Sequence, residues 1–348
     1  MSELLFRVGY RGRMMDDSFL ELLGAAPGIA PTSLDVPTDE FDAALASCHA
    51  YYVSSARNET PPHLYLTQQL IDRMPSMFLA VTSGAGYDTV DVAACTAAGI
   101  AVLNQSGGNA EGVAEHTLGM ILVLLKRMPE MHLAMRAGDI GERERFMGRE
   151  LVGRTVGLVG LGFVGERVAE LLRVFGCRVL AYDPTIDADT CAQRGATQVS
   201  LQRLLEESDV VSLHCPLSHE TRGLIGAREL ASMREGALLI NTARGGIVDE
   251  MALHAALESG HLGGAGLDAW EQEPPPVDHP LLTHSRVIGT VHTGGVTSES
   301  RARVASMAAE ALIGAAAGDV PPRLLNPEVL PAYQQRWSAT FDRAFPAR

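Results

Sequence analysis

Residues 155–172 read TVGLVGLGFVGERVAELL, and this stretch decides the fold. Its apolar, β-branched start predicts a buried strand, and the apolar spacing in its second half predicts an amphipathic helix. Between the two, Gly160, Gly162 and Gly165 have the spacing GxGxxG. The first glycine permits a tight turn, the second lets a pyrophosphate approach the backbone, and the third lets helix and strand pack closely. The stretch therefore predicts the phosphate-binding turn of a dinucleotide fold.

An acidic residue follows the next predicted strand. The run Val179–Tyr182 predicts that strand, and Asp183 comes directly after it in VLAYDP. A carboxylate there can accept hydrogen bonds from both ribose hydroxyls of NAD and would repel the additional phosphate of NADP, so NAD is the expected cofactor. The alternative is a structural glycine turn with a surface aspartate. Methyltransferases also combine a glycine-rich turn with a downstream acid, so the catalytic groups must decide the class.

Short apolar runs alternate with helical patterns along most of the chain. Strands that alternate with helices form parallel, doubly wound sheets that bind ligands at the carboxyl ends of the strands. The other expected strands are Leu4–Val8, Ala50–Val53, Phe78–Thr82, Ile100–Leu103, Asp209–Leu213, Ala237–Ile240, Gly264–Leu267 and Val287–Gly289.

The expected fold class is α/β, with two Rossmann-like domains. A split substrate domain, 1–104 plus 296–348, is interrupted by an inserted NAD-binding domain with a doubly wound parallel sheet, 105–295. Long helices are expected at about Glu111–Met128 and Ser298–Ala317. The proline-rich tail after the second helix is expected to return to the first domain.

The composition limits the partners. The chain has 348 residues and a net charge of −14, with a pI of about 5.2. Such acidity disfavours nucleic acid and anionic membranes as partners. The N-terminus carries no apolar signal core, and none of the five cysteines forms a CxxC pair. We therefore expect free thiols, no metal site and a cytoplasmic location.

An arginine follows one predicted strand of the second series. Arg244, in LLINTARGGIVDE, lies just past that strand and therefore faces the expected ligand crevice. Its planar guanidinium suits bidentate binding of the carboxylate of a 2-keto acid. The alternative is an ion pair with a nearby acid such as Asp249.

A glutamate and a histidine follow two further strands. Glu273 lies in GLDAWEQEPP, where Asp268 ends the strand, and His292 lies in VIGTVHTGGV. A carboxylate beside an imidazole fixes its tautomer and stabilises imidazolium, so the histidine can take a hydroxyl proton as a hydride leaves the carbon. Among eleven histidines, a structural role for His292 is the alternative.

Three other positions are weaker candidates. In SGAGYDTVD, which begins at Ser83, the N–H groups of Gly84 and Ala85 are candidates for an anion-binding nest, or the segment is a plain turn. Arg57, in SSARNET, is an anion ligand or a surface charge. His214, in VVSLHCPL, lines the cofactor pocket or has a structural role.

Taken together, seven ordered segments between about Ala50 and Asn326 resemble the D-isomer-specific 2-hydroxyacid dehydrogenase family. These segments are SGAGYDTVD, NQSGGNAEGVAEHTLGMIL, GRTVGLVGLGFVG, SLHCPLSHETRGLI, ALLINTARGGIVDE, GLDAWEQEPP and VHTGG. The resemblance implies hydride transfer between the nicotinamide of NAD and C2 of a small D-2-hydroxy or 2-keto acid. It implies Arg244 as the carboxylate and carbonyl binder and His292 as the acid/base, paired with Glu273.

The resemblance also implies the ligand contacts. Asp268 would bond the nicotinamide amide, and Thr242 and Ala243 would pass close to the cofactor. The full expected cofactor set is Gly160, Gly162, Phe163, Val164, Asp183, His214, Pro216, Thr221, Thr242, Ala243, Arg244, Asp268, His292 and Gly294. The expected substrate set is Arg57, Ser83, Gly84, Ala85, Arg244 and His292.

The same resemblance implies a homodimer formed through the helix Glu111–Met128. Val291 is a departure, because the family commonly has proline before the catalytic histidine. A second reading of the same fold is an NAD-sensing binding protein similar to the corepressors related to this family. The particular acid stays open, with glyoxylate, hydroxypyruvate, its phosphate and bulkier 2-keto acids as candidates.

Overall fold

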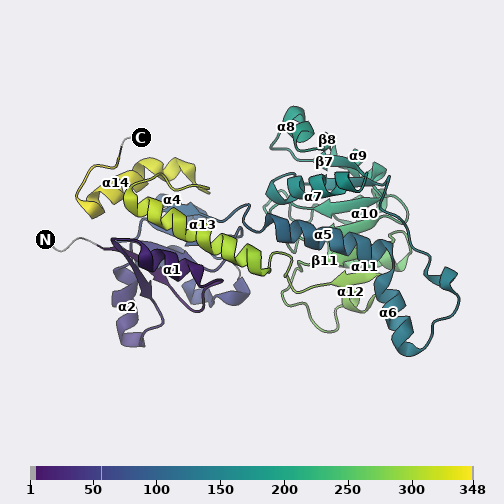
Figure 1. Ribbon diagram of the computed structural model, residues 1–348, viewed down its shortest axis with the longest axis horizontal. Helices are drawn as coiled ribbons and strands as arrows, with labels where there is room; N and C mark the ends of the chain where they lie inside the picture. The colour runs from purple at the N-terminus through teal and green to yellow at the C-terminus, as the bar shows by residue number, and fades with distance from the viewer. Residues whose placement is uncertain (1–4, 56, 347–348) are drawn as a thin grey trace. The chain divides into compact units, whose positions relative to one another are not determined.

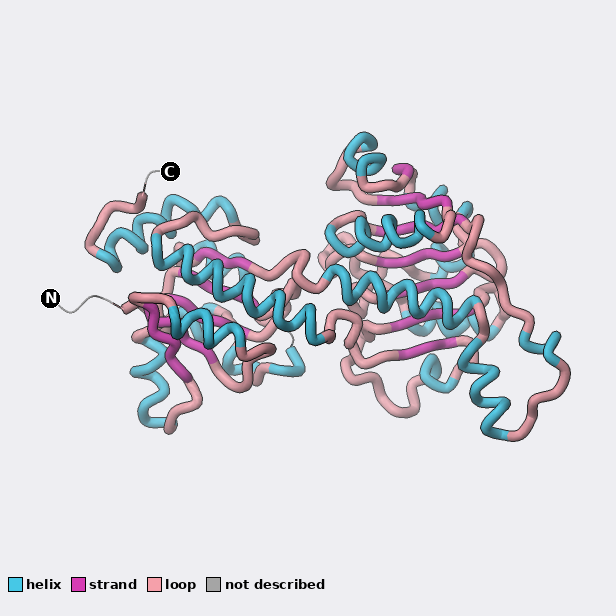
Figure 2. The backbone as a smooth tube through the Cα atoms, in the orientation of Figure 1, coloured by secondary structure: helices cyan, strands magenta, loops and turns pink. Residues whose placement is uncertain are grey.

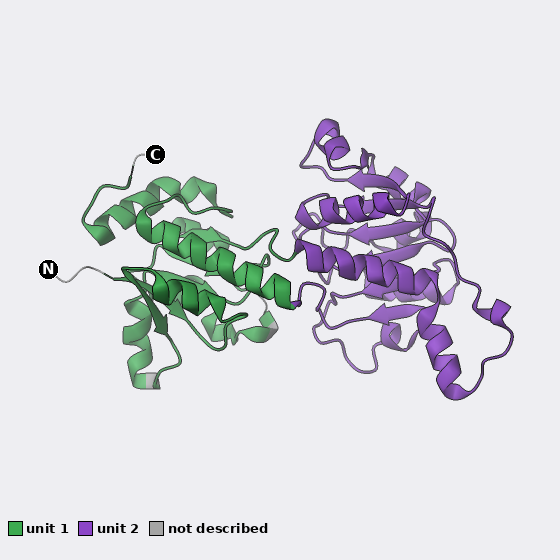
Figure 3. Cartoon of the chain, in the orientation of Figure 1, with its two compact units in different colours: residues 1–109, 298–348 green, residues 110–297 purple. Residues whose placement is uncertain are grey.

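The computed structural model describes residues 5–55 and 57–346. The chain divides into two compact units, which Figure 3 colours green and purple. Unit 1 consists of Met1–Asn109 and Ser298–Arg348, and unit 2 of Ala110–Thr297. Each unit contains a parallel sheet with helices packed on it (Figure 2), which is the expected α/β class.

The sheet of unit 1 has five parallel strands in the order β2-β1-β3-β4-β5. They are β1 Phe6–Tyr10, β2 Ile29–Ser33, β3 Ala50–Val53, β4 Leu79–Thr82 and β5 Ala101–Leu103. The helices are α1 Ser18–Ala25, α2 Thr38–Ala46, α3 Gln68–Ile71, α4 Val92–Ala97, α13 Ser298–Ala317 and α14 Leu330–Phe341 (Figure 1). Strand β2 was not expected from the sequence, because Pro31 interrupts a short run. Proline is tolerated there because β2 is an edge strand.

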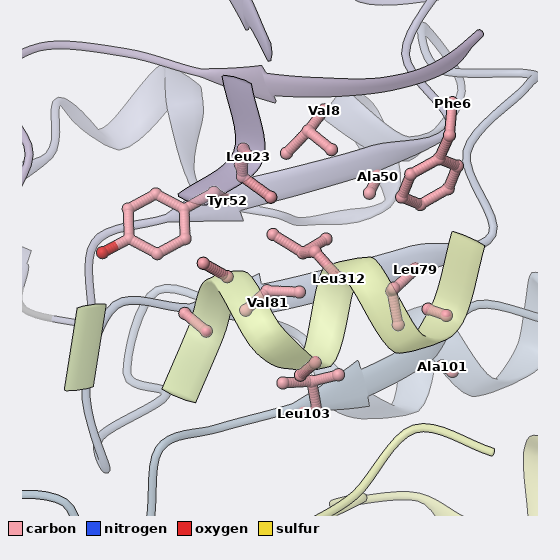
Figure 4. Packing of buried hydrophobic residues seen from close by; sticks show 14 of the residues in the cluster. Phe6, Val8, Leu23, Ala50, Tyr52, Leu79, Val81, Ala101, Leu103 and Leu312 are labelled. Atoms are coloured by element: carbon pink, nitrogen blue, oxygen red, sulfur yellow. The ribbon is translucent and has the colours of Figure 1, made fainter. Parts of the chain in front are cut away.

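Helix α13 packs on the sheet of unit 1 through small residues. Its face toward the core carries five buried alanines and Leu312, and Figure 4 shows Leu312 among Val81, Tyr52 and Ala50 of the sheet. The tail beyond α13 returns to the same unit. There the Asn326 side chain accepts from the N–H of Val102 (2.9 Å) and donates to the carbonyl of Ile100 (3.0 Å).

The sheet of unit 2 has seven parallel strands in the order β12-β11-β10-β9-β6-β7-β8. They are β6 Thr155–Val159, β7 Arg178–Tyr182, β8 Thr197–Gln198, β9 Val210–Leu213, β10 Leu238–Asn241, β11 Gly264–Leu267 and β12 Val287–Gly289. The helices are α5 Ala110–Leu125, α6 Met128–Ala137, α7 Phe163–Val174, α8 Ala188–Gln193, α9 Leu201–Glu207, α10 Ala227–Ser232, α11 Glu250–Glu258 and α12 Pro280–Thr283. The strand order reverses between β6 and β9, and a doubly wound sheet binds its ligand at such a switch point.

The helix expected at about Glu111–Met128 is α5, which ends three residues earlier, and a further helix that was not expected, α6, begins at Met128. Helix α5 ends at Leu125, and Arg127 has a left-handed backbone (φ 54°) before α6 begins. Pro129 explains the break, because proline has no N–H for the helical ladder and restricts the residue before it. None of the described helices is both long and apolar enough to span a membrane.

Candidate active site

The glycine-rich turn joins β6 to α7. Gly160 has φ 93°, and a Cβ there would lie 2.8 Å from backbone atoms of His214 and Cys215. At Gly165 a Cβ would lie 2.3 Å from the carbonyl oxygen of Gly160. A Cβ at Gly162, in contrast, would meet no described atom within 4 Å. The first and third glycines are therefore required by packing within the protein, and the second leaves an open approach.

The start of α7 faces this opening. Gly162 is the N-cap, Phe163 and Val164 form the first turn, and no side chain in the described chain caps it. The N–H groups of an uncapped first turn and the positive end of the helix dipole attract an anion. The turn therefore fits the pyrophosphate of a dinucleotide.

The carboxylate of Asp183 contacts the turn directly. It accepts hydrogen bonds from the N–H of Leu161 (2.9 Å) and from the N–H and hydroxyl of Thr185 (2.9 and 2.6 Å). Burial opposes ionisation, but these bonds and the charge of Arg194 hold the pKa of Asp183 below its ordinary value. A fixed negative charge therefore stands beside the phosphate-binding turn.

His214 follows β9 and backs the turn. Its Nε2 lies 2.9 Å from the hydroxyl of Ser212, and its buried Nδ1 has no hydrogen-bond partner within the described residues. Burial lowers the pKa of His214 to about 3, so the imidazole is neutral. An uncharged ring with one unbonded nitrogen against the turn fits a cofactor-lining role better than a structural one.

Several other expected cofactor residues lie in the loops after β9 and β10. The Thr221 hydroxyl donates to the carbonyl of Pro216 (2.6 Å), which closes the first loop. Thr242 shares a hydroxyl contact of 2.8 Å with Thr117 of α5, and the N–H of Ala243 donates to the side chain of Asn241. The two loops follow the carboxyl ends of β9, which is adjacent to β6, and of β10, which is adjacent to β9.

The imidazole of His292 meets the carboxylate of Glu273. Nδ1 lies 2.9 Å from each carboxylate oxygen, and both side chains are partly buried. Burial opposes ionisation of Glu273, yet the hydrogen bond and charge of His292, the N–H of Trp270 and the charge of Arg244 together lower its pKa. The carboxylate therefore holds Nδ1, which leaves Nε2 as the ring nitrogen for proton exchange with a substrate.

Asp268 holds the loop that carries His292. Its buried carboxylate accepts from the hydroxyl of Thr290 (2.6 Å) and from the N–H groups of Thr293 and Gly294 (2.8 Å each). Its carbonyl accepts from the N–H of His292 (2.9 Å). His292 itself has φ 57°, a left-handed conformation that is uncommon for residues other than glycine. Four bonds to one residue thus keep the histidine in an unfavourable backbone conformation.

Arg244 lies after β10, as the sequence pattern predicts. Its backbone carbonyl accepts from the side chain of Asn241, and its Nη1 donates to the carbonyl of Ala243, both at 2.8 Å. Its positive charge is the smallest of the influences that lower the pKa of Glu273. Asp249, the alternative partner considered above, caps α11 by accepting from the N–H groups of Met251 and Ala252.

The other expected substrate residues belong to unit 1. Arg57 donates through Nε to the carbonyl of Asp88 (3.0 Å). The Ser83 hydroxyl accepts from the N–H of Ser55, and the carbonyls of Gly84 and Ala85 accept from residues that follow β5. The segment is therefore an ordered turn at the carboxyl ends of β3 and β4.

The sequence reasoning did not single out His116 or Trp270. His116 of α5 lies 3.1 Å from the hydroxyl of Thr290 and 3.6 Å from the carboxylate of Asp268. Both residues lie within quoted motifs, AEHTLGMIL and GLDAWEQEPP. The sequence offered one indication of each: a histidine in the first motif and a tryptophan in the second, to which no role had been given.

Together, the turn, the carboxylate after β7 and the imidazole–carboxylate pair define the class: a nicotinamide-dinucleotide dehydrogenase on a doubly wound fold. The family model described as D-isomer specific 2-hydroxyacid dehydrogenase, NAD binding domain, matches residues 118–294. The chain belongs to this family, and NAD is its cofactor.

Relatives named after different substrates are similar to the chain. It is 34% identical to D-3-phosphoglycerate dehydrogenase of Bacillus subtilis over 314 residues, which is 90% of the chain but only 58% of that relative. It is 38% identical to glyoxylate reductase of Korarchaeum cryptofilum over 75% of the chain and 80% of that relative. The D-lactate dehydrogenase of Aquifex aeolicus, solved with NAD and lactic acid, superposes with a TM-score of 0.78 at 29% identity, covering 91% of this chain and 98% of that one.

Proposed function

We propose that the chain interconverts a small 2-keto acid and the corresponding D-2-hydroxy acid. The observation that carries this proposal is the His292–Glu273 pair, with 2.9 Å from Nδ1 to each carboxylate oxygen, on loops of the NAD-binding unit. Bound NAD supplies the hydride in its reduced form and accepts it in its oxidised form.

His292, Glu273 and Arg244 divide the chemistry on the substrate. His292 donates a proton from Nε2 to the carbonyl oxygen during reduction and takes it back during oxidation. Glu273 stabilises the imidazolium and fixes the tautomer. Arg244 binds the substrate carboxylate and carbonyl through its planar fork. His292 and Arg244 are thus both catalytic and substrate-binding.

The expected cofactor set is proposed without change. Phe163 and Val164 hold the pyrophosphate with the glycines, and Asp183 binds the ribose hydroxyls and disfavours NADP. Asp268 is proposed to bond the nicotinamide amide besides holding the loop that carries His292. Gly294 belongs with it, because a Cβ there would lie 2.9 Å from the Asp268 carboxylate.

Unit 1 is proposed as the substrate domain. The proposed boundaries are 1–104 plus 296–348 for this domain and 105–295 for the NAD-binding domain. Arg57 and the turn Ser83–Ala85 are proposed to bind the acid, since a glycine-containing turn at the ends of parallel strands offers N–H groups to an anion.

A homodimer in the cytoplasm is the proposed state of the chain. Helix α6 and the segment after it expose large apolar side chains, and such a patch marks an association surface. These side chains are Met128, Leu133, Met135, Ile140 and Met147. The alternative of an NAD-sensing binding protein gains no support from the relatives, whose names are those of reductases and dehydrogenases.

The test is NADH oxidation with glyoxylate, pyruvate, hydroxypyruvate, phosphohydroxypyruvate and phenylpyruvate. We expect turnover with at least one of them, and its loss in His292→Ala. Tight NADH binding without turnover on any acid would favour the binding-protein reading. Size-exclusion chromatography with light scattering tests the homodimer.

A further inference from the structure

Trp270 bonds both Glu273 and the segment that leads to His292. Its backbone N–H donates to Oε1 of Glu273 (3.1 Å), and its indole N–H donates to the carbonyl of Thr290 (2.9 Å). Thr290 begins the segment that leads through Val291 to His292. One buried residue, with 3% of its surface exposed, therefore links the loop of the carboxylate to the loop of the imidazole.

Trp270 is closely packed on several sides. A Cβ at Gly289 of β12 would lie 2.7 Å from the indole, and a Cβ at Gly245 would lie 1.8 Å from the Trp270 carbonyl oxygen. On another side the His279 ring stands edge-on to the indole at 5.7 Å. His279 in turn pairs with the buried Glu250, at 3.1 Å. The indole is thus held in one place on several sides.

The carbonyl of Thr290 depends on this indole. The N–H of Thr290 donates to the carbonyl of Leu267 (2.9 Å), and its hydroxyl donates to Asp268. The indole N–H bonds the remaining backbone group. Because His292 holds a left-handed conformation that its own side chain does not favour, rotation of the preceding peptides must be restrained from outside.

We propose that Trp270 is a positioning residue of the acid/base pair: its indole N–H fixes the Thr290 carbonyl and so keeps His292 Nδ1 against Glu273. Phenylalanine at this position would fill most of the space but would leave the carbonyl without that donor. The expected effect on kcat rests on the proposed function. The expected effect on the His292–Glu273 hydrogen bond rests on geometry alone.

The chain supplies a matched control, because it contains only two tryptophans. Trp337 of unit 1 is fully buried, and its indole N–H donates to the carbonyl of Ala315 (2.7 Å). Trp270→Phe and Trp337→Phe therefore delete the same chemical bond in two different units. A third protein carries 3-benzothienylalanine at position 270, which keeps the bicyclic ring and replaces N–H by sulfur.

The kinetic measurement is kcat of the whole chain with the best acid, together with the Kd of NADH. Both changes at position 270 should lower kcat about tenfold, the effect of one buried hydrogen bond and a slightly misplaced catalytic group, with the Kd within about twofold. Trp337→Phe should leave kcat within about twofold. Unchanged kcat at position 270, or an equal loss in Trp337→Phe, would overturn the proposal.

A second measurement does not need turnover. The low-field proton resonance of a histidine N–H bonded to a carboxylate reports the His292–Glu273 bond, and Glu273→Gln identifies it. It should weaken or shift in both position-270 proteins and persist in Trp337→Phe. If no acid is turned over, the proposed function fails while this resonance still decides the role of Trp270. If Trp270→Phe does not fold, the benzothienylalanine protein decides it, since its shape is conserved.

Discussion

Two turns at the carboxyl ends of strands in one sheet, after β6 and after β12, are built in different ways. The turn after β6 takes its shape from glycine backbone, with Gly160 at φ 93° and packed against neighbouring backbone. The turn after β12 places a histidine at φ 57°; its N–H groups donate to Asp268, and the carbonyl of Thr290 accepts from Trp270. The first turn takes its conformation from its own glycines, although Asp183 also bonds it, whereas the second turn holds a conformation that its histidine does not favour and needs side chains from other segments.

The largest effect is expected from His292→Ala, which removes the imidazole that the turn after β12 positions. We expect kcat to fall by roughly 10²- to 10⁴-fold, the range for loss of a general acid/base, with NADH affinity little changed. Steady-state kinetics and NADH fluorescence titration measure the two quantities. His254→Ala, on α11, is the control. Equal loss of binding and turnover would mean that the histidine is not the acid/base.

Alanine substitutions in the turn after β6 should distinguish the role of Gly160 from that of Gly162. Gly160→Ala should destabilise unit 2 by roughly 1–3 kcal/mol, since the residue keeps a strained φ and its Cβ would meet backbone at 2.8 Å. Gly162→Ala should leave stability unchanged but weaken NADH binding. Denaturant unfolding and NADH titration of the two variants test this. A wild-type affinity in Gly162→Ala would show that the pyrophosphate does not approach there.

Asp183 adds a charge to the turn after β6. In Asp183→Ala the preference for NAD over NADP should fall by roughly tenfold, because one like-charge repulsion is removed. The ratio of kcat/KM for the two cofactors is the readout, and Asp187→Ala, which removes a cap of α8, is the control. An unchanged ratio would assign cofactor selection to another residue.

The smallest effect is the pH dependence of stability from Glu273. Because its pKa is lowered from 4.5 in the folded protein, Glu273 stabilises the fold above that value, and this contribution is lost as the pH falls through the folded pKa. The free energy of unfolding of wild type and Glu273→Gln should therefore converge toward acid pH. Parallel curves would mean that the carboxylate is not linked to folding.

Much of the fold could be predicted from short apolar runs in the sequence. Six strands of unit 2 begin and end close to the expected positions, because a buried parallel strand is a short, continuous apolar run, whereas the two-residue edge strand β8, Thr197–Gln198, was not expected. Strand β2 could not be found, since its IAPTS sequence contains proline and only its edge position permits pairing. The helix expected to end at about Met128 ends at Leu125, and α6, which begins at Met128, was not expected.

The sequence by itself determined what depends on neighbouring residues: the glycine spacing at 160–165, the acid after β7 and the family motifs. Steric limits on φ and ψ act within a few residues, so such features can be read locally. The pairing of His292 with Glu273 was expected from the family motifs. Only the tertiary structure decided that Nδ1 makes this contact, that the loop after β12 bonds Asp268, and that Trp270 donates to Thr290. These contacts join the ends of different strands, and only the packing of the whole sheet brings them together.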